Sequence, residues 1–386
     1  MPLRILIIYD HFYPAQKAGG IVRSLYNLCE ATNDVVEYYI ICSCFDYREK
    51  MPMPNIQVNQ WTSLENNIHI YYTNPEKISI NYYRNIFNQI SPDIIYLNGI
   101  FSYKFNILPL IMFKTNLLQT KIIVAPRGML QKGAIDSKKL KKKVFFAISK
   151  WLGLFAVVQW HATDNQECSD IKNIFVNTKR IWIVPAIPSI YFQSSPSVFL
   201  HVKEKTQLKI VTISLIAKKK NHKFALEILS KLSGSVSISY TIYGPIKDSS
   251  YWESCLEVMR NAPKNIQIEY FGLLAPEDVE HALSQHHFFL LPTQGENFGH
   301  AIFEAMSAGL PVIISDQTPW RNLETQKVGW DIPLSEPERF VAAIERAARM
   351  DQAEYEQWSR AAHQYALDFI AKSNLKERYL EMFSTT

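Results

Sequence analysis

The sequence predicts an α/β protein with two doubly wound, Rossmann-like domains. Three observations carry this prediction. A chain of 386 residues is long for one hydrophobic core and suits two domains of about 150–200 residues each. Short apolar runs alternate with amphipathic helical stretches, which is the pattern of parallel sheets covered by helices on both faces. The alternation is interrupted near residues 185–205 by an irregular stretch with prolines and serines, and then it starts again.

The amino-terminal domain is predicted over residues 1–187. Its first strand is the apolar run at residues 3–9, which is followed by a loop with Gly19 and Gly20 and by a helix from Ile21. Further strands are expected at 35–42, 68–72, 93–97, 121–125, 155–160 and 181–184.

A linker is predicted at residues 188–206, because this stretch has no clear hydrophobic period. The carboxy-terminal domain follows over residues 207–370. A helix at residues 371–386 is a candidate to pack back on the amino-terminal domain. The strands of the second domain are expected at 208–216, 236–243, 266–271, 288–291 and 312–314, and its later helices at 250–260, 300–308, 336–349 and 352–371.

Composition excludes several classes of protein. Hydrophobic residues make up 47% of the chain and charged residues 20%, so the protein is globular and not disordered. The five cysteines form no CxxC pair, which indicates reduced thiols in a cytosolic protein. No GxGxxG follows any strand, which disfavours a dehydrogenase. One lysine run is the sole support for nucleic-acid binding, so no nucleic-acid partner is expected.

A soluble or peripheral protein is expected, because no apolar run is long enough to span a bilayer. The formal net charge of +5 suits an anionic substrate or a membrane surface and selects neither. The run Lys138–Lys143 precedes an apolar helix. It is either a peripheral contact with an anionic membrane or the solvated face of an ordinary helix.

The stretch at residues 288–315 is the centre of the predicted site. A buried strand at 288–291 leads into a polar loop at 292–299 and then into a helix at 300–308. The helix is ended by Gly309 and by a proline two residues later. The loop therefore joins the carboxyl end of a strand to the amino terminus of a helix, where open α/β sheets bind anions.

Two carboxylates mark this stretch, Glu296 in the loop and Glu304 on the helix. The backbone amides of Phe298, Gly299 and His300 are expected to lack partners within the helix and to attract a diphosphate. Glu304 stands among apolar residues, where an ionised carboxylate is costly unless it is hydrogen-bonded. A sugar diol is one partner for it, and solvent or a nearby lysine is the alternative.

This segment resembles the E-x7-E signature of retaining GT-B glycosyltransferases of family 4, the glycosyl transferases group 1. The seven residues between Glu296 and Glu304 are NFGHAIF, and the run EAMSAGLPVI that starts at Glu304 is similar to the family's EAMA-x-G-x-PVI. The resemblance implies two domains facing across a cleft, with the acceptor bound by the amino-terminal domain and the nucleotide-sugar by the carboxy-terminal domain. It also implies sugar transfer from a nucleotide-diphosphate sugar. It implies that Glu304 binds the ribose diol, that Glu296 binds the donor sugar, and that Lys220 and the amides of Asn297–Gly299 bind the diphosphate.

The run KKKN at residues 218–221 also follows a predicted strand. The family usually carries Arg-x4-Lys followed by Gly or Asn, and Lys220 and Asn221 fit the second half of that pattern. Leu215 stands at the arginine position, so Lys219 is expected to supply the missing charge; a solvated lysine loop is the alternative. No D-x-D motif is present, and neither a metal nor another cofactor is expected.

Gly19 and Gly20 stand where family members carry a GG loop near the donor diphosphate, although an ordinary turn is the alternative. Arg127 lies in the run RGML, which is similar to a branch of polysaccharide enzymes. It is expected to face the cleft, with a structural ion pair as the alternative. Residues 318–320 are expected to line the donor sugar pocket, and residues 243–245 and 271–273 to border the base.

The predicted function is a retaining glycosyltransferase acting on a growing cell-surface polysaccharide or lipid-linked glycan, in the cytoplasm or at the inner face of the plasma membrane. A nucleotide-sugar epimerase and a non-catalytic nucleotide-sugar-binding homologue are the alternatives. The predicted catalytic residues are Glu296, Lys220 and Arg127. The predicted donor-binding residues are Gly19, Gly20, Lys219, Lys220, Asn221, Glu296, Asn297, Phe298, Gly299, His300 and Glu304.

Overall fold

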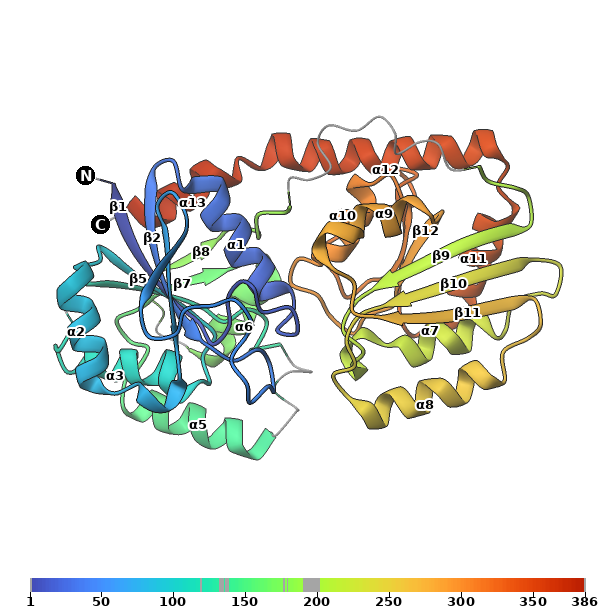
Figure 1. Cartoon of the computed structure of the whole chain (residues 1–386). Helices are drawn as coiled ribbons and strands as arrows, with labels where there is room; N and C mark the ends of the chain where they lie inside the picture. Colours follow the sequence, from blue (N-terminus) through green and yellow to red (C-terminus); the bar gives the residue numbers. More distant parts are fainter. Residues whose placement is uncertain are drawn as a thin grey trace. The chain divides into compact units, whose positions relative to one another are not determined.

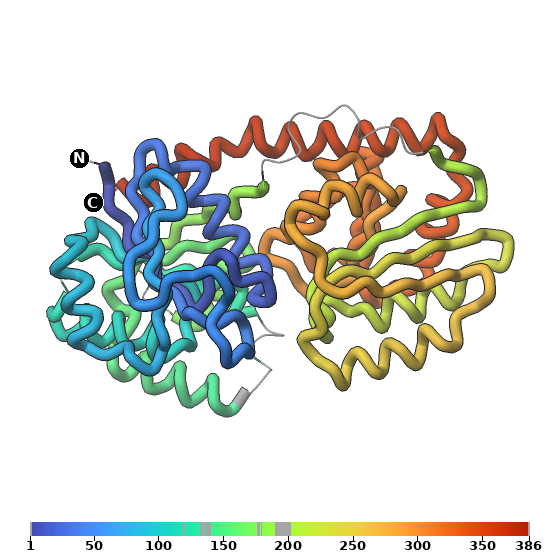
Figure 2. Tube along the Cα trace, in the orientation of Figure 1, coloured from blue at the N-terminus to red at the C-terminus, as the bar shows by residue number. Residues whose placement is uncertain are grey.

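The computed structural model describes residues 2–118, 120–131, 135, 139–175, 178, 180–189 and 202–384. The chain divides into two compact units (Figure 1), and each holds a mainly parallel sheet with helices, which confirms the predicted α/β class. The amino-terminal unit comprises Met1–Ile187 with Asn374–Thr386, and the carboxy-terminal unit comprises Pro188–Ser373. The first strand and the last helix thus lie in the same unit (Figure 2). Most of the predicted linker, residues 188–206, lies outside the described residues.

The sheet of the amino-terminal unit has the strand order β3-β4-β2-β1-β5-β6-β7-β8. Neighbouring strands are parallel except β3 and β4, which are antiparallel. The strands are β1 Leu3–Ile8, β2 Val36–Ser43, β3 Trp61–Glu65, β4 Ile68–Thr73, β5 Ile94–Asn98, β6 Lys121–Ala125, β7 Gln159–Ala162 and β8 Ile181–Ile183. The helices are α1 Gly20–Thr32, η1 Pro75–Lys77, α2 Ile80–Ile90, η2 Tyr103–Ile107, α3 Leu108–Lys114, α5 Lys139–Trp151, α6 Asn165–Ile174 and α13 Leu375–Ser384.

Helices cover both faces of this sheet. Residues of α2, α3 and α6 join one hydrophobic cluster with the strands, while α1 and α13 pack together on the sheet's other side (Figure 1). All five residues of β5 are buried. Strands covered on both faces need apolar side chains at successive positions, and this is why they appear in the sequence as unbroken apolar runs.

In this unit one predicted strand was wrong and one strand was not predicted. The strand expected at 155–160 begins only at Gln159, because the chain first leaves α5 through Gly153, whose φ of 58° continues into a turn. Buried Leu154 and Phe155 belong to that turn and pack into the core. The edge strand β3 was not predicted, since its residues are only partly buried and lack an apolar run.

The sheet of the carboxy-terminal unit is entirely parallel, in the order β11-β10-β9-β12-β13-β14. The strands are β9 Gln207–Ile213, β10 Ser237–Tyr243, β11 Ile266–Gly272, β12 Phe288–Leu291, β13 Val312–Ser315 and β14 Gly329–Ile332. The helices are η4 Lys218–Lys220, α7 His222–Leu229, α8 Ser249–Arg260, η5 Pro276–Asp278, α9 Val279–Ser284, α10 His300–Ser307, α11 Pro337–Arg349 and α12 Gln352–Ser373.

The strand order reverses between β9 and β12. From β9 the chain builds outward through β10 and β11, and then it returns to place β12 on the other side of β9. In such sheets the carboxyl ends of the two strands at the reversal form the crevice where ligands bind. The turn Lys218–Lys220, called the lysine turn below, follows β9. The loop that holds Glu296, called the glutamate loop below, follows β12. The topology therefore brings both predicted segments to this point.

Helices α7, α8 and α11 and the first turns of α12 share a hydrophobic cluster with one face of the sheet, and α9 and α10 cover the other (Figure 1). Helix α10 packs against α12. The Phe369 ring of α12 lies 5.8 Å from Phe298 and 5.2 Å from Trp320, between ring centroids. The long helix therefore supports the loop that precedes α10. Among the helices of the described chain, none is long and apolar enough to cross a membrane.

Candidate active site

The first part of the candidate site is the lysine turn after β9. Lys218–Lys220 form a single 3-10 turn after β9, closed by hydrogen bonds from the Lys220 amide to Ala217 O (2.9 Å) and from the Asn221 amide to Lys218 O (3.1 Å). Asn221 then adopts a left-handed conformation with a φ of 62° and starts α7. Asparagine tolerates this conformation better than most residues. The short turn fixes the backbone from which Lys220 extends.

Lys220 reaches the loop after β12. Its Nζ lies 2.5 Å from Oε1 of Glu296, and the two side chains are 22% and 12% exposed. The pair is largely shielded from water, so its attraction is stronger than that of a surface ion pair, and loss of one partner leaves the other charge poorly solvated. The structure thus brings together two of the three predicted catalytic residues.

Thr293 ties the lysine turn to the glutamate loop. Its hydroxyl is fully buried and lies 3.0 Å from Lys219 O and 3.1 Å from Glu296 Oε1. The amide of Gln294 donates to the same Lys219 carbonyl at 2.7 Å. Thr293 was not among the predicted site residues. Its position in the sequence was nevertheless a clue, because it is a small polar residue two positions after the buried strand β12.

The amino terminus of α10 closes the loop. Gly299 precedes the helix with a φ of 79°, and a Cβ there would lie 3.0 Å from Cδ1 of Ile302. No side chain caps this end and no acidic residue stands in its first turn. Trp320, which is buried, donates from Nε1 to Phe298 O at 2.7 Å and so orders the loop. The partial positive charge of the helix end is therefore not neutralised by a carboxylate of its own first turn.

Glu304 lies on the buried side of α10 and is 7% exposed. The hydroxyl of Ser189 donates to its Oε1 at 3.3 Å. The alternative in which Glu304 faces solvent is therefore wrong. His300, at the first position of the helix, packs its ring against Phe298 with the centroids 4.9 Å apart.

His222 adds an uncharged imidazole beside the lysine turn. The pKa of His222 is lowered to about 4, mainly by burial; a backbone hydrogen bond at Leu215 opposes this shift and the nearby Lys220 charge adds to it. Its Nε2 lies 3.0 Å from Ser214 Oγ and 3.2 Å from Leu215 O. A neutral ring at physiological pH adds no cation here, so the lysines remain the positive charges of this turn.

The remaining predicted residues, Gly19, Gly20 and Arg127, lie in the amino-terminal unit. Gly19 precedes α1 with a φ of 86°, and Gly20 is the first residue of that helix, whose end no side chain caps. Arg127 is 9% exposed and donates from Nε to Asn98 Oδ1 (2.8 Å) and from Nη2 to the Tyr96 hydroxyl (2.9 Å). These contacts match a structural role in the domain core; its predicted catalytic role stays a prediction.

Two aromatic rings stand at the carboxyl ends of β10 and β11. Tyr243 and Phe271 are stacked, with centroids 5.5 Å apart and an interplanar angle of 24°, and Phe271 is 60% exposed. Their role at the base of a nucleotide stays a prediction. Within the described part of the chain, no group of three or more His, Cys, Asp or Glu residues is placed to hold a metal ion.

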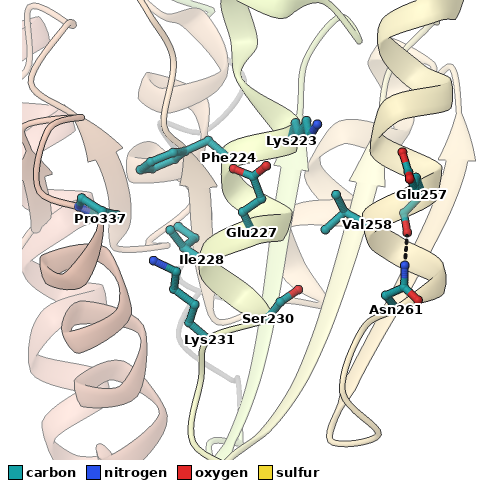
Figure 3. A pocket seen from close by; sticks show the side chains of 10 residues that line it. All are labelled: Lys223, Phe224, Glu227, Ile228, Ser230, Lys231, Glu257, Val258, Asn261 and Pro337. Carbon is teal, nitrogen blue, oxygen red and sulfur yellow. Dashed lines mark hydrogen bonds between the residues drawn. The ribbon is translucent and has the colours of Figure 1, made fainter.

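A separate groove runs between α7 and α8 (Figure 3). Surface charges such as Lys231 and Glu257 line it together with Phe224, and none of the predicted site residues borders it. It is therefore distinct from the site at the carboxyl ends of β9 and β12.

Comparison with known proteins agrees with this geometry. Residues 197–365 match the model of the family Glycosyl transferases group 1. O-antigen chain mannosyltransferase B of Escherichia coli is 28% identical over 141 residues, a match that spans 34% of this chain and only 36% of that protein. This match over residues 197–365 and the similar mannosyltransferase support the predicted enzyme class, a glycosyltransferase.

Solved structures show the same fold over the whole chain. Sucrose-phosphate synthase from Thermosynechococcus elongatus aligns with a TM-score of 0.76 at 14% identity, with both chains covered completely. HepE of Anabaena, solved in complex with UDP and glucose, aligns with a TM-score of 0.73 at 12% identity, again over all of both chains. The predicted GT-B fold is confirmed by these likenesses.

Proposed function

We propose that this protein is a retaining glycosyltransferase of family 4 that moves a sugar from a nucleotide-diphosphate sugar to a growing cell-surface polysaccharide or lipid-linked glycan. The observation that carries the proposal is the Lys220–Glu296 pair at the reversal point of the sheet. It stands inside the segment that matches the glycosyl transferases group 1 model.

Each side chain of the site has a role in this proposal. A diphosphate accepts hydrogen bonds from the amides that begin α10 and charge from Lys220, which then shifts from the Glu296 carboxylate toward the phosphate. Glu296, released from the full attraction of the lysine, accepts hydrogen bonds from hydroxyls of the donor sugar. Glu304 exchanges its long contact with Ser189 for the two hydroxyls of the ribose.

The chemical step follows from the placement of charge. The bond between the anomeric carbon and the distal phosphate oxygen breaks, and the acceptor oxygen forms its bond on the same face of the sugar. The acceptor proton passes to the departing phosphate. The positive charge of Lys220 and the α10 dipole stabilise the diphosphate as its negative charge grows, which is the largest contribution a preorganised site makes.

The acceptor class rests on two supports. The similar mannosyltransferase is named for the O-antigen chain, which is a cell-surface polysaccharide. The run RGML at Arg127 resembles enzymes of polysaccharide pathways. The proposed location is the cytoplasm or the inner face of the plasma membrane, where a nucleotide-sugar and such an acceptor would meet.

The test is incubation of the purified protein with a panel of UDP-, GDP- and ADP-sugars, with release of free nucleotide as the readout. Slow hydrolysis of one donor, lost in Lys220→Ala and kept in Lys218→Ala, supports a transferase. Interconversion of the sugar identifies an epimerase, and binding without turnover identifies a non-catalytic homologue. Both of these results contradict the proposal. The anomeric proton of the product reports retention or inversion by NMR.

A further inference from the structure

Helix α5 presents an apolar row to solvent. Trp151 is 85% exposed, Leu140 77%, and Val144 and Ile148 each 51%. Leu152, directly after the helix, is 46% exposed. A row of large apolar side chains on one helix face is unusual at the surface of a soluble domain and marks a surface that meets another apolar phase.

Lysines flank this row on both sides. At about 100° per residue, Leu140, Val144, Ile148 and Trp151 fall within about 80° around the helix. By the same spacing Lys141 borders the row on one side, and Lys143 and Lys150 border it on the other; all three are exposed. No acidic residue occurs between residues 137 and 163.

The opposite face of α5 packs against the hydrophobic core. The rings of Phe145 and Phe146 pack against Phe101 at centroid distances of 5.3 and 5.8 Å, and Phe146 also lies 6.0 Å from Phe175. Ser149 is buried on the same side. The fold thus holds α5 by one face and does not use the exposed row, so packing within the unit does not explain that row.

We propose that α5 is an interfacial membrane helix, with the row Leu140, Val144, Ile148 and Trp151 inserted among the acyl chains of an anionic bilayer. Lys141, Lys143 and Lys150 stand at the edges of the row, where their long side chains reach the headgroup phosphates. An apolar face bordered by cations and lacking acids is complementary to an anionic lipid surface. The helix lies in the plane of the membrane interface and does not span the bilayer. None of these residues is assigned a role in glycosyl transfer.

The decisive experiment is flotation of the full chain with vesicles of phosphatidylcholine alone and with phosphatidylglycerol added. The protein is expected to float with the anionic vesicles and to be released by salt. Lys141→Gln, Lys143→Gln and Lys150→Gln are each expected to weaken binding about 5-fold, and the triple variant about 100-fold. Val144→Ser with Ile148→Ser, which keeps every charge, is expected to weaken it at least 30-fold, to about the level of neutral vesicles.

Matched controls exclude general effects. Lys205→Gln, Lys231→Gln and Lys372→Gln remove the same charge from exposed positions elsewhere. Val35→Ser with Val202→Ser removes apolar groups that are 45% and 76% exposed. Both control sets are expected to bind vesicles like the unchanged protein. Quenching of Trp151 by brominated acyl chains, absent in Trp151→Phe, places the row below the headgroups.

Three results would overturn the proposal. The first is failure of the unchanged protein to float with anionic vesicles. The second is equal binding by the serine pair and the unchanged protein, which would leave only adsorption by lysines. The third is a dimer in light scattering that the serine pair dissociates, which would make the row an interface between copies of the chain. Donor hydrolysis in solution, measured in parallel, tests the proposed enzyme independently of membrane binding.

Discussion

Nζ of Lys220 and Oε1 of Glu296 lie 2.5 Å apart although 76 positions separate the two residues in the sequence. The contact joins the turn after β9 to the loop after β12, the two strands between which the order of the sheet reverses. Before any ligand binds, each charge therefore holds the other in position. A diphosphate entering this point meets a lysine that is already oriented.

Lys220→Ala is expected to lower kcat at least about 100-fold and to raise the donor KM, because it removes the cation that stabilises the leaving diphosphate. Steady-state release of nucleotide measures both constants. Lys218→Ala is the matched control, since Lys218 is an exposed neighbour in the same turn. Similar kinetics in the two variants would remove Lys220 from the site.

Glu304→Gln is expected to weaken binding of the nucleoside diphosphate about 10-fold, because an amide accepts hydrogen bonds from a diol less strongly than a carboxylate. Isothermal titration with the nucleotide alone measures this. Glu296→Gln, which changes the group assigned to the sugar, is expected to keep that affinity within about 3-fold and to lose kcat. The reverse pattern would exchange the two roles.

Thr293→Val removes a buried hydroxyl that lies beside Lys219 O and Glu296 Oε1. It is expected to lower the free energy of unfolding by about 1–3 kcal/mol, because the valine leaves buried polar atoms without that partner. Urea denaturation measures the change, and kcat is expected to fall as the glutamate loop loosens. Thr293→Ser keeps the hydroxyl and is the control. If Thr293→Ser lowered the free energy of unfolding as much as Thr293→Val does, the methyl group and not the hydroxyl would be the stabilising group.

Arg127→Gln distinguishes a structural from a catalytic arginine. The buried guanidinium donates to Asn98 and Tyr96, so its removal is expected to cost about 2–4 kcal/mol of unfolding free energy. Donor affinity of the folded variant is expected to stay unchanged. Unaltered stability together with a collapsed kcat would instead support the catalytic role predicted from the sequence.

The buried His222 predicts loss of stability at mildly acidic pH. Its pKa of about 4 in the folded protein lies below the ordinary value near 6.5, so the unfolded chain binds the proton more tightly. The stabilisation is present above about pH 6.5 and is lost as the pH falls toward 4, by about 2 kcal/mol between pH 7 and pH 5. Urea titrations at the two values measure it. His222→Gln is expected to reduce this difference in unfolding free energy between the two pH values. His281→Gln, which changes an exposed histidine, is the control and is expected to keep the difference. The same pH dependence of stability in all three proteins would contradict the prediction.

The sequence alone was enough for the α/β fold class and for the elements of the segment at residues 288–315. Strands covered on both faces need unbroken apolar runs, as in Phe288–Leu291, and a helix that ends at a Gly in a left-handed turn needs Gly309. These requirements are local, so the residues that meet them lie close together in the sequence and can be recognised there. The candidate carboxylates could be found for the same reason, because Glu296 and Glu304 stand on one loop and the helix that follows it.

Only the tertiary structure decided which distant residues meet. That Lys220 contacts Glu296 depends on β12 returning beside β9, and a strand order is not written in any local pattern. The hydroxyl of Thr293 and the indole of Trp320 became visible as supports of the loop only once their partners were placed. The burial of Arg127 likewise became known only from the structure, because its sequence context suited both a cleft position and a structural ion pair. Local periodicity reports which side of an element is apolar, while the partners of a polar group depend on the packing of the whole domain.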